Sequence, residues 1–157
     1  MYLATLLLIS ILLLAYCILI VQYRKWFCRL QAFEPKKNSS PITSFSVIIP
    51  ARNEAENIGM CLKGILQQSH PKELFEVIVV NDHSTDATAE VVKELQQRHS
   101  NLHLIDLAEY IGASTINAYK KKAIELAIST SKCDWIITTD ADCHIPERWL
   151  ELYDAYI

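Results

Sequence analysis

The chain has 157 residues and a formal net charge of −3, and its acidic balance lies in the part that follows the first 40 or so residues. A general nucleic-acid-binding surface needs a basic face on the folded part, so that class of function is excluded. The five cysteines are odd in number and contain no CxxC pair, which argues against a disulfide framework and favours a reducing compartment.

The first predicted element is a membrane-spanning helix over residues 1–23. This stretch has no charged side chain, and about 20 apolar residues in a helix span a hydrocarbon core of roughly 30 Å. A cleaved secretory signal is the alternative, but it needs a basic start, a shorter apolar core and a small-residue cleavage site, none of which precedes Arg24. We therefore expect a single-pass anchor in the cell membrane.

Residues 24–44 are predicted to form a basic juxtamembrane segment and a linker. Basic residues next to a membrane helix favour the cytoplasmic side, and the stretch 34–44 (EPKKNSSPITS) has the prolines and serines typical of a linker. The soluble domain, residues 45–157, is then expected to face the cytoplasm. The basic residues of the segment are Arg24, Lys25, Arg29, Lys36 and Lys37.

The soluble part alternates predicted strands with predicted helices. Short β-branched runs predict strands over residues 45–49, 75–80, 102–105 and 135–139. The first helix is predicted to begin at Asn53, with Glu56 in the capping-box position, and to end near Gln68. Residues 106–116 are expected to be irregular, a further helix is expected over 117–129, and Pro146 is expected in the first turn of the last helix.

This alternation predicts an α/β fold. Strands separated by helices form βαβ units, which give a mostly parallel sheet with helices on both faces. Ligands bind such sheets beyond the carboxyl ends of the strands. The unusual polar runs of this chain follow three of the strands: PARNE at 50–54, NDHSTD at 81–86 and DAD at 140–142. We expect them to meet at one rim.

Asp140 and Asp142 are the candidate metal ligands. Side chains at positions i and i+2 of an extended segment share a face, and paired carboxylates suit Mg²⁺ or Mn²⁺, with a diphosphate completing the coordination. A solvated turn with helix-capping aspartates is the alternative. Zinc is disfavoured, since Cys143 and His144 have no second ligand pair at zinc spacing.

Other polar residues of the rim have chemistry suited to a nucleotide. Asp82 can accept a hydrogen bond from a base imide N–H, which favours uracil, although NDHSTD can also be only a turn and helix cap. Arg52 can stack on a base or reach phosphate, and Glu54 can hold a ribose. Lys120 or Lys121 can approach a diphosphate, but consecutive lysines are also typical of a solvated helix face. His83 and His144 are assigned no role.

Four motifs in this order, SVIIPARNEAENI, VIVVNDHSTDAT, AYKKKAIELAI and WIITTDADC, resemble the family 2 glycosyltransferases with the GT-A fold, a Rossmann-like nucleotide-binding architecture. The resemblance covers about residues 45–150. It implies that Asp140 and Asp142 form the metal and ribose-diphosphate motif, and that Asp82 binds the base. It also implies that Pro50, Arg52 and Glu54 belong to the nucleotide pocket, and that Lys120 or Lys121 lies near the diphosphate.

The sequence departs from the family pattern at three positions and in length. Asn81 stands where many members have aspartate, and His83 and Tyr119 stand where glycine is common. Family members also continue past the helix that follows Asp142 with a stretch that carries the general base, so we expect this chain to be a truncated, donor-binding fragment with no catalytic base of its own.

The predicted function is therefore that of a membrane-anchored, inverting, metal-dependent glycosyltransferase. Its donor would be a nucleoside-diphosphate sugar, with uridine diphosphate the favoured carrier, and its acceptor a lipid or a polysaccharide. A non-catalytic, membrane-tethered nucleotide-binding module is the alternative. A dinucleotide oxidoreductase is disfavoured, because no GxGxxG follows the first strand and the chain has only three glycines.

Overall fold

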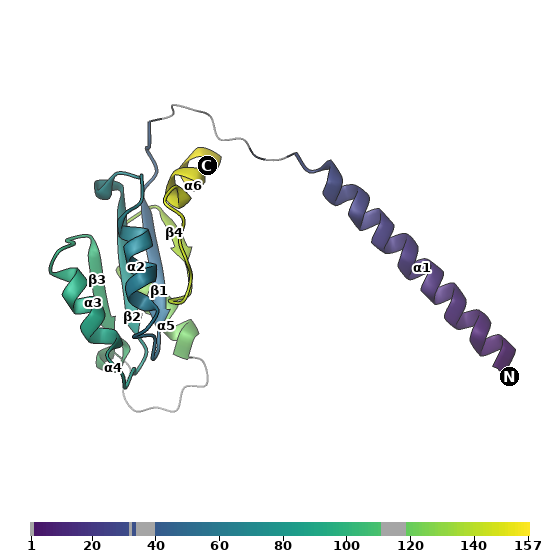
Figure 1. The fold of residues 1–157 in the computed structure, drawn as a ribbon, viewed down its shortest axis with the longest axis horizontal. Helices are drawn as coiled ribbons and strands as arrows, with labels where there is room; N and C mark the ends of the chain where they lie inside the picture. The colour runs from purple at the N-terminus through teal and green to yellow at the C-terminus, as the bar shows by residue number, and fades with distance from the viewer. Residues whose placement is uncertain (1, 32, 34–39, 111–118) are drawn as a thin grey trace. The chain divides into compact units, whose positions relative to one another are not determined.

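The computed structural model describes residues 2–31, 33, 40–110 and 119–157. The chain divides into two compact units, Met1–Glu34 and Pro35–Ile157 (Figure 1). The first contains one helix, α1 (Tyr2–Arg29), whose most apolar part has a mean hydropathy of 2.9. By length and composition this helix is able to cross a membrane, and it continues beyond the predicted end at residue 23 as far as Arg29.

The second unit is built on a four-stranded sheet in the order β3-β2-β1-β4. All three strand pairs are parallel, as predicted, and Ile48 at the centre lies opposite Ile78 on one side and Thr138 on the other. The β-branched runs that predicted the strands are the residues that form them. The strands are β1 (Phe45–Ala51), β2 (Phe75–Asn81), β3 (Leu102–Asp106) and β4 (Trp135–Thr138).

Helices cover both faces of this sheet (Figure 1). Because side chains alternate along a strand, Val47 and Ile49 pack with α2, α3 and α6 on one face. Ile48 packs with α4 and α5 on the other, where Ala123 and Ala127 of α5 are fully buried. The helices are α2 (Ile58–Leu66), the 3₁₀ turn η1 (Lys72–Leu74), α3 (Thr88–Gln96), α4 (Leu107–Tyr110), α5 (Tyr119–Thr130) and α6 (Trp149–Tyr156).

Two predicted helix starts are wrong. The first helix begins at Ile58, and Asn53 lies before it with a left-handed backbone (φ 56°), so it does not cap the helix. The last helix begins at Trp149 and leaves Pro146 outside. Within the predicted irregular segment, the short helix α4 occupies residues 107–110, while residues 111–118 lie outside the described part of the chain.

Gln68 explains why the last helix starts late. Its side-chain amide donates to the carbonyl oxygens of Gly64 (2.9 Å) and Pro146 (2.7 Å), and its side-chain oxygen accepts the backbone N–H of Leu150 (2.9 Å). The side chain is buried. It therefore ties the segment before α6 to the end of α2, in a contact between residues about 80 positions apart.

A buried carboxylate fixes the start of β4. Glu76 of β2 accepts hydrogen bonds from the Ser46 hydroxyl and from the backbone N–H of Lys132, both at 2.6 Å. Cys133 in the same turn donates its N–H to Ser46 (3.3 Å). The turn between α5 and β4 is thus tied to the amino ends of β1 and β2, and this sets the register in which β4 reaches the opposite rim.

Candidate functional site

A hollow of about 270 Å³ lies at the carboxyl ends of β1, β2 and β4. Seven of the eight residues predicted to bind substrate or metal line it, together with Ala51 and Ala141. Lys121 is not among the lining residues. Their binding roles are still predictions, but the structure brings the side chains to one place: Pro50, Arg52, Glu54, Asp82, Lys120, Asp140 and Asp142.

The sheet register explains this convergence. Ala51 lies opposite Asn81, and the backbone N–H of Asp82 donates to the Ala51 carbonyl (2.8 Å), so Asp82 leaves β2 just where β1 ends. On the other side, Thr139 donates its N–H to Ile48 (3.1 Å) and extends the β1–β4 pairing by one residue. Asp140 therefore leaves β4 beside the end of β1.

The turn that carries the two candidate metal ligands is anchored by its middle. Ala141 is buried in the core, whereas Asp140 and Asp142 on either side are exposed. The Asp140 carbonyl accepts the N–H of Cys143 (3.3 Å) and the thiol of Cys61 on α2 (3.6 Å). Both carboxylates are thus free of the core while the backbone between them is held in place.

Cys61 serves this turn as a structural donor. The pKa of its thiol is raised to about 11, mainly by burial and to a smaller extent by the neighbouring Cys143 and Asp142. The thiol is therefore protonated at neutral pH and able to donate to the Asp140 carbonyl. A protonated, buried cysteine is chemically inert, so Cys61 is not a candidate nucleophile.

Of the three consecutive lysines, Lys120 faces the hollow. Its Nζ lies 2.6 Å from Oδ1 of Asp140. Lys121 and Lys122 instead approach Glu125 on their own helix, at 3.9 and 3.0 Å, and the hydrogen bond from Lys122 is the main reason that the pKa of Glu125 lies below its ordinary value. Of the two lysines predicted to approach a diphosphate, Lys120 therefore lies at the hollow and Lys121 does not line it.

Asp82 sits between two cationic or protonatable groups. Its Oδ1 lies 2.9 Å from Nδ1 of His83, and its Oδ2 lies 4.0 Å from Nη1 of Arg52. The Asp82 side chain is only 10% exposed, whereas that of Arg52 is 57% exposed. Sequence reasoning gave His83 no role, yet the structure places its ring against the carboxylate that was predicted to bind a base.

The two loops that follow β1 and β2 are joined by hydrogen bonds, which sequence reasoning missed. The NDHSTD run was expected to cap α3, but Ala87 occupies the N-cap position and makes no side-chain capping bond. Asp86 nevertheless accepts the backbone N–H of Thr88, the first residue of α3 (3.0 Å). Other hydrogen bonds join the two loops. The bonds are Asn53 N to Ser84 Oγ (3.0 Å), Thr85 N to Asn53 Oδ1 (2.8 Å), Glu54 N to Thr88 Oγ1 (2.8 Å) and Ala55 N to Asp86 Oδ2 (3.1 Å).

The carboxylate of Asp86 accepts several of the hydrogen bonds in these joined loops. The hydroxyl of Thr88 is the main reason that the pKa of its carboxyl lies below the ordinary value, and the backbone N–H groups of Ala55 and Thr88 add to the effect. Each of these donors stabilises the ionised form. The joined loops therefore depend on a charged carboxylate.

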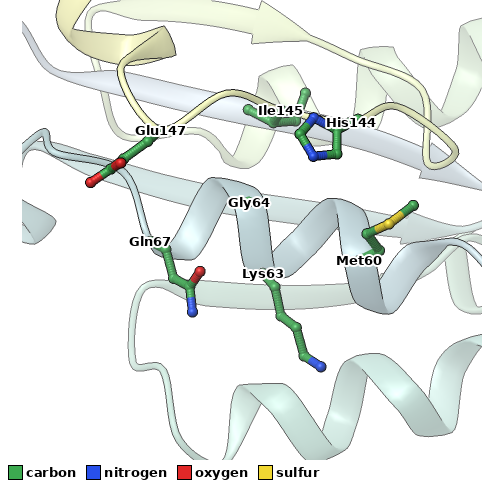
Figure 2. Close-up of a pocket in the computed structure, with 7 residues that line it drawn as sticks. All are labelled: Met60, Lys63, Gly64, Gln67, His144, Ile145 and Glu147. Atoms are coloured by element: carbon green, nitrogen blue, oxygen red, sulfur yellow. The ribbon is translucent and has the colours of Figure 1, made fainter.

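A second hollow, of about 550 Å³, lies between α2 and the segment 144–147 (Figure 2). None of the predicted binding residues lines it. Gly64 forms part of its wall, and a Cβ there would lie 2.9 Å from the Ile145 carbonyl oxygen, so the close approach of the two segments requires glycine. Figure 2 shows Lys63, Gln67, Met60 and His144 around this hollow.

The described part of the chain contains no group of three or more His, Cys, Asp or Glu side chains arranged to hold a metal. Asp140 and Asp142 contribute two carboxylates to the first hollow. Mg²⁺ is commonly bound by one or two protein carboxylates together with phosphate oxygens of the substrate. The residues present fit a divalent cation that is held jointly with a diphosphate.

A family model described as glycosyl transferase family 2 matches residues 46–153, which is more than half of the chain. The chain belongs to this family. The matched range contains all seven lining residues named above and both loops that are joined by hydrogen bonds. The family resemblance inferred from the four sequence motifs is thereby confirmed.

Relatives of this glycosyltransferase family 2 chain agree on the fold. It is 34% identical over 113 residues to glycosyltransferase AglE of Haloferax volcanii, covering 72% of this chain and 35% of that protein. S. aureus TarS in complex with UDP has a TM-score of 0.63 at 30% identity, covering 73% and 32% of the two chains. Mannosyltransferase PcManGT from Pyrobaculum calidifontis, in complex with GDP-Man and Mn²⁺, has a TM-score of 0.63 at 25% identity, covering 80% and 34%.

The chain thus spans about a third of the length of these relatives. The two solved structures share its fold, and the expected GT-A architecture is confirmed. The two features of the rim that were missed, the left-handed residues Asn53 and His83, had one signal in the sequence. The family resemblance leads one to expect glycine at position 83, and glycine often marks a left-handed backbone.

Proposed function

We propose that residues 45–157 form the donor-binding part of a glycosyltransferase that uses a nucleoside-diphosphate sugar. The observation that carries this proposal is the convergence of seven predicted residues from three strand ends and α5 in one hollow. The complex of S. aureus TarS with UDP supports a uridine nucleotide as the carrier. The exposed, charged lining, with two carboxylates beside a lysine, suits a polar ligand that brings its own phosphates.

Six of the lining residues have a proposed task. Asp82 accepts the imide N–H of the base, Arg52 stacks on the base or reaches phosphate, and Glu54 holds the ribose. Lys120 turns from Asp140 to the diphosphate, and Asp140 and Asp142 hold Mg²⁺ or Mn²⁺. A cation held by these two carboxylates would supply positive charge next to the leaving diphosphate, and the Mn²⁺ in the complex of PcManGT supports this assignment.

Transfer is proposed to be inverting, in keeping with the family resemblance. That reaction needs a base on the side of the sugar opposite the leaving diphosphate. The carboxylates after Asp142 are engaged elsewhere: Glu151 bonds Arg148 (2.6 Å), Asp154 accepts the N–H of Thr43 (2.8 Å), and Glu147 borders the second hollow. We therefore assign donor binding to the residues that line the first hollow, and we assign none of these three carboxylates the role of general base.

The remaining parts of the proposal concern the membrane. Residues 1–23 are proposed to anchor the chain in the cell membrane, and residues 24–44 to link the anchor to a domain in the cytoplasm. The apolar α1 and the basic residues at its end, Arg24, Lys25 and Arg29, support this orientation. An acceptor at the membrane surface, a lipid or a growing polysaccharide, fits such an anchor.

The test is a titration of the full chain, in detergent micelles, with UDP in the presence and absence of Mn²⁺. We expect binding that depends on Mn²⁺ and is lost in Asp142→Ala. Glu147→Ala is the matched control, because it removes an exposed carboxylate five residues away that does not line the site, and it should bind like the wild type. Unchanged binding in Asp142→Ala would overturn the metal assignment, and absence of UDP binding would overturn the function.

A further inference from the structure

His83 has an unusual backbone. Its φ is 55°, in the left-handed region, and among the described residues other than glycine it shares this feature only with Asn53. Glycine adopts this conformation without cost, whereas a residue with a Cβ is strained there. Strain of this kind persists where the surroundings hold it, and it concentrates at functional sites.

The imidazole of His83 contacts one carboxylate oxygen of Asp82. Nδ1 of His83 lies 2.9 Å from Oδ1. Because a carboxylate only accepts hydrogen bonds, the imidazole carries a proton at Nδ1 and donates it. The other oxygen, Oδ2, has a looser neighbour, since Nη1 of Arg52 is 4.0 Å away and the Arg52 side chain is largely exposed. The two oxygens of Asp82 therefore differ in how firmly they are held.

We propose that His83 is a positioning residue: its hydrogen bond to Oδ1 fixes the Asp82 carboxylate so that Oδ2 accepts an N–H from the base. This inference rests on the proposed function, in which Asp82 binds the base. A carboxylate oxygen in a side chain that is only 10% exposed needs a hydrogen-bond partner. His83 remains such a partner when Arg52 turns toward the ligand.

The selectivity of this arrangement follows from hydrogen-bond chemistry. A carboxylate with one oxygen already engaged and the other aimed at the ligand accepts the N3–H of uracil. A base without that hydrogen leaves the oxygen unmatched in a poorly hydrated place. Without His83, the carboxylate can rotate and its preference for the N–H weakens. His83 therefore contributes to discrimination between bases more than to binding of the diphosphate.

The test compares UDP with its N3-methyl derivative, which keeps the diphosphate and lacks the N–H. Titrations use the full chain in detergent micelles with Mn²⁺, as the wild type, His83→Gly and His83→Asn. We expect His83→Gly to lower the preference for UDP by about five- to tenfold, which is within the range of the net contribution of one hydrogen bond. His83→Asn should restore most of it, because asparagine tolerates a left-handed backbone and places an amide N–H near the position of Nδ1.

Two further measurements distinguish a failure of the role proposed for His83 from a failure of the role proposed for Asp82. The thermal midpoint of His83→Gly should equal or exceed that of the wild type, since glycine relieves the strain, so weaker discrimination cannot be attributed to unfolding. Asp82→Ala should abolish the preference. If Asp82→Ala keeps it, the base-binding role proposed for Asp82 is wrong, and this inference fails with it. If Asp82→Ala loses the preference while His83→Gly retains it, the inference about His83 alone is overturned.

Discussion

Lys120 and Asp140 form an ion pair at the place where a diphosphate and a cation are proposed to bind. Their side chains are 64% and 58% exposed, and exposed pairs of this kind stabilise a fold by about 0–1 kcal/mol. A ligand can therefore separate them at little cost. The pair holds Lys120 close to the proposed diphosphate position before any ligand is bound.

Replacing Lys120 by alanine should weaken binding of UDP in the presence of Mn²⁺ by about tenfold, since a charge-assisted hydrogen bond to phosphate is lost. The thermal midpoint should hardly change. Lys121→Ala is the matched control, because Lys121 approaches Glu125 at 3.9 Å and does not line the hollow. Titration calorimetry on both variants decides the matter, and equal losses in the two would contradict the assignment of Lys120.

Asp86 should make the stability of the domain depend on pH. Hydrogen bonds, first from the Thr88 hydroxyl, hold the pKa of its carboxyl below the ordinary value of 3.8. A group with a lowered folded-state pKa stabilises the fold above its unfolded pKa, and this contribution is lost as the pH falls through the folded value. The thermal midpoint of Asp86→Asn should therefore lie below that of the wild type near neutral pH.

The same comparison at acidic pH supplies the check. As the pH is lowered through 3.8 and further, the wild type should lose its advantage over Asp86→Asn, and the two melting curves should converge. A gap that is equally wide at neutral and acidic pH would show that the carboxylate charge contributes nothing to the joined loops.

The candidate site was largely predictable at this scale because its residues follow strands. Asp82 and Asp140 come directly after β-branched runs, and parallel strands bring their carboxyl ends to one edge. The choice of Lys120 over Lys121 was not predictable, because it depends on the rotational position of α5 at the rim. The contacts of Asn53 and His83 could not be predicted for another reason. Asn53 bonds residues of another loop, and the contact of His83 with Asp82 depends on a left-handed backbone.

At the scale of elements, the contact of α2 with the segment before α6 is tight at one glycine. A Cβ at Gly64 would lie 2.9 Å from the backbone oxygen of Ile145. Gly64→Ala should therefore destabilise the domain by about 1–3 kcal/mol, the usual cost of overpacking. Chemical unfolding of the full chain in micelles measures this change.

Gly59 on the same helix is the matched control. A Cβ there would lie 3.5 Å from Cγ1 of Val91, an ordinary contact. Gly59→Ala should stabilise the domain by about 0.5–1 kcal/mol, because alanine has the higher helix propensity. If both variants change stability in the same direction and by the same amount, the close approach at Gly64 is not what determines the effect.

The strands could be predicted more accurately than the helix starts. A β-branched run such as FEVIVV predicts a buried strand, and β2 includes all of it. The start of α2 was misplaced because the Asn53 side chain accepts the N–H of Thr85, a residue in another loop. The start of α6 was misplaced because Gln68 holds Pro146. In both cases a tertiary hydrogen bond displaced a capping pattern that was locally reasonable.

For the whole molecule, membrane attachment should reside in α1. The full chain should remain with membranes after extraction at alkaline pH, because residues 2–23 of α1 carry no charged side chain and expose a mostly apolar surface. A chain that lacks residues 1–23 should be released into the soluble fraction. Immunoblots of the two fractions make the comparison, and release of the full chain would contradict the anchor.

The hydrogen bonds between the loops after β1 and β2 also bear on how a nucleotide would bind. Loops that are ordered before the ligand arrives lose little conformational entropy on association. Calorimetry of UDP binding should accordingly show only a small entropic penalty. Hydrogen–deuterium exchange at Asn53 and Thr85 should be slow already in the free protein, because the backbone N–H of each is hydrogen-bonded without any ligand.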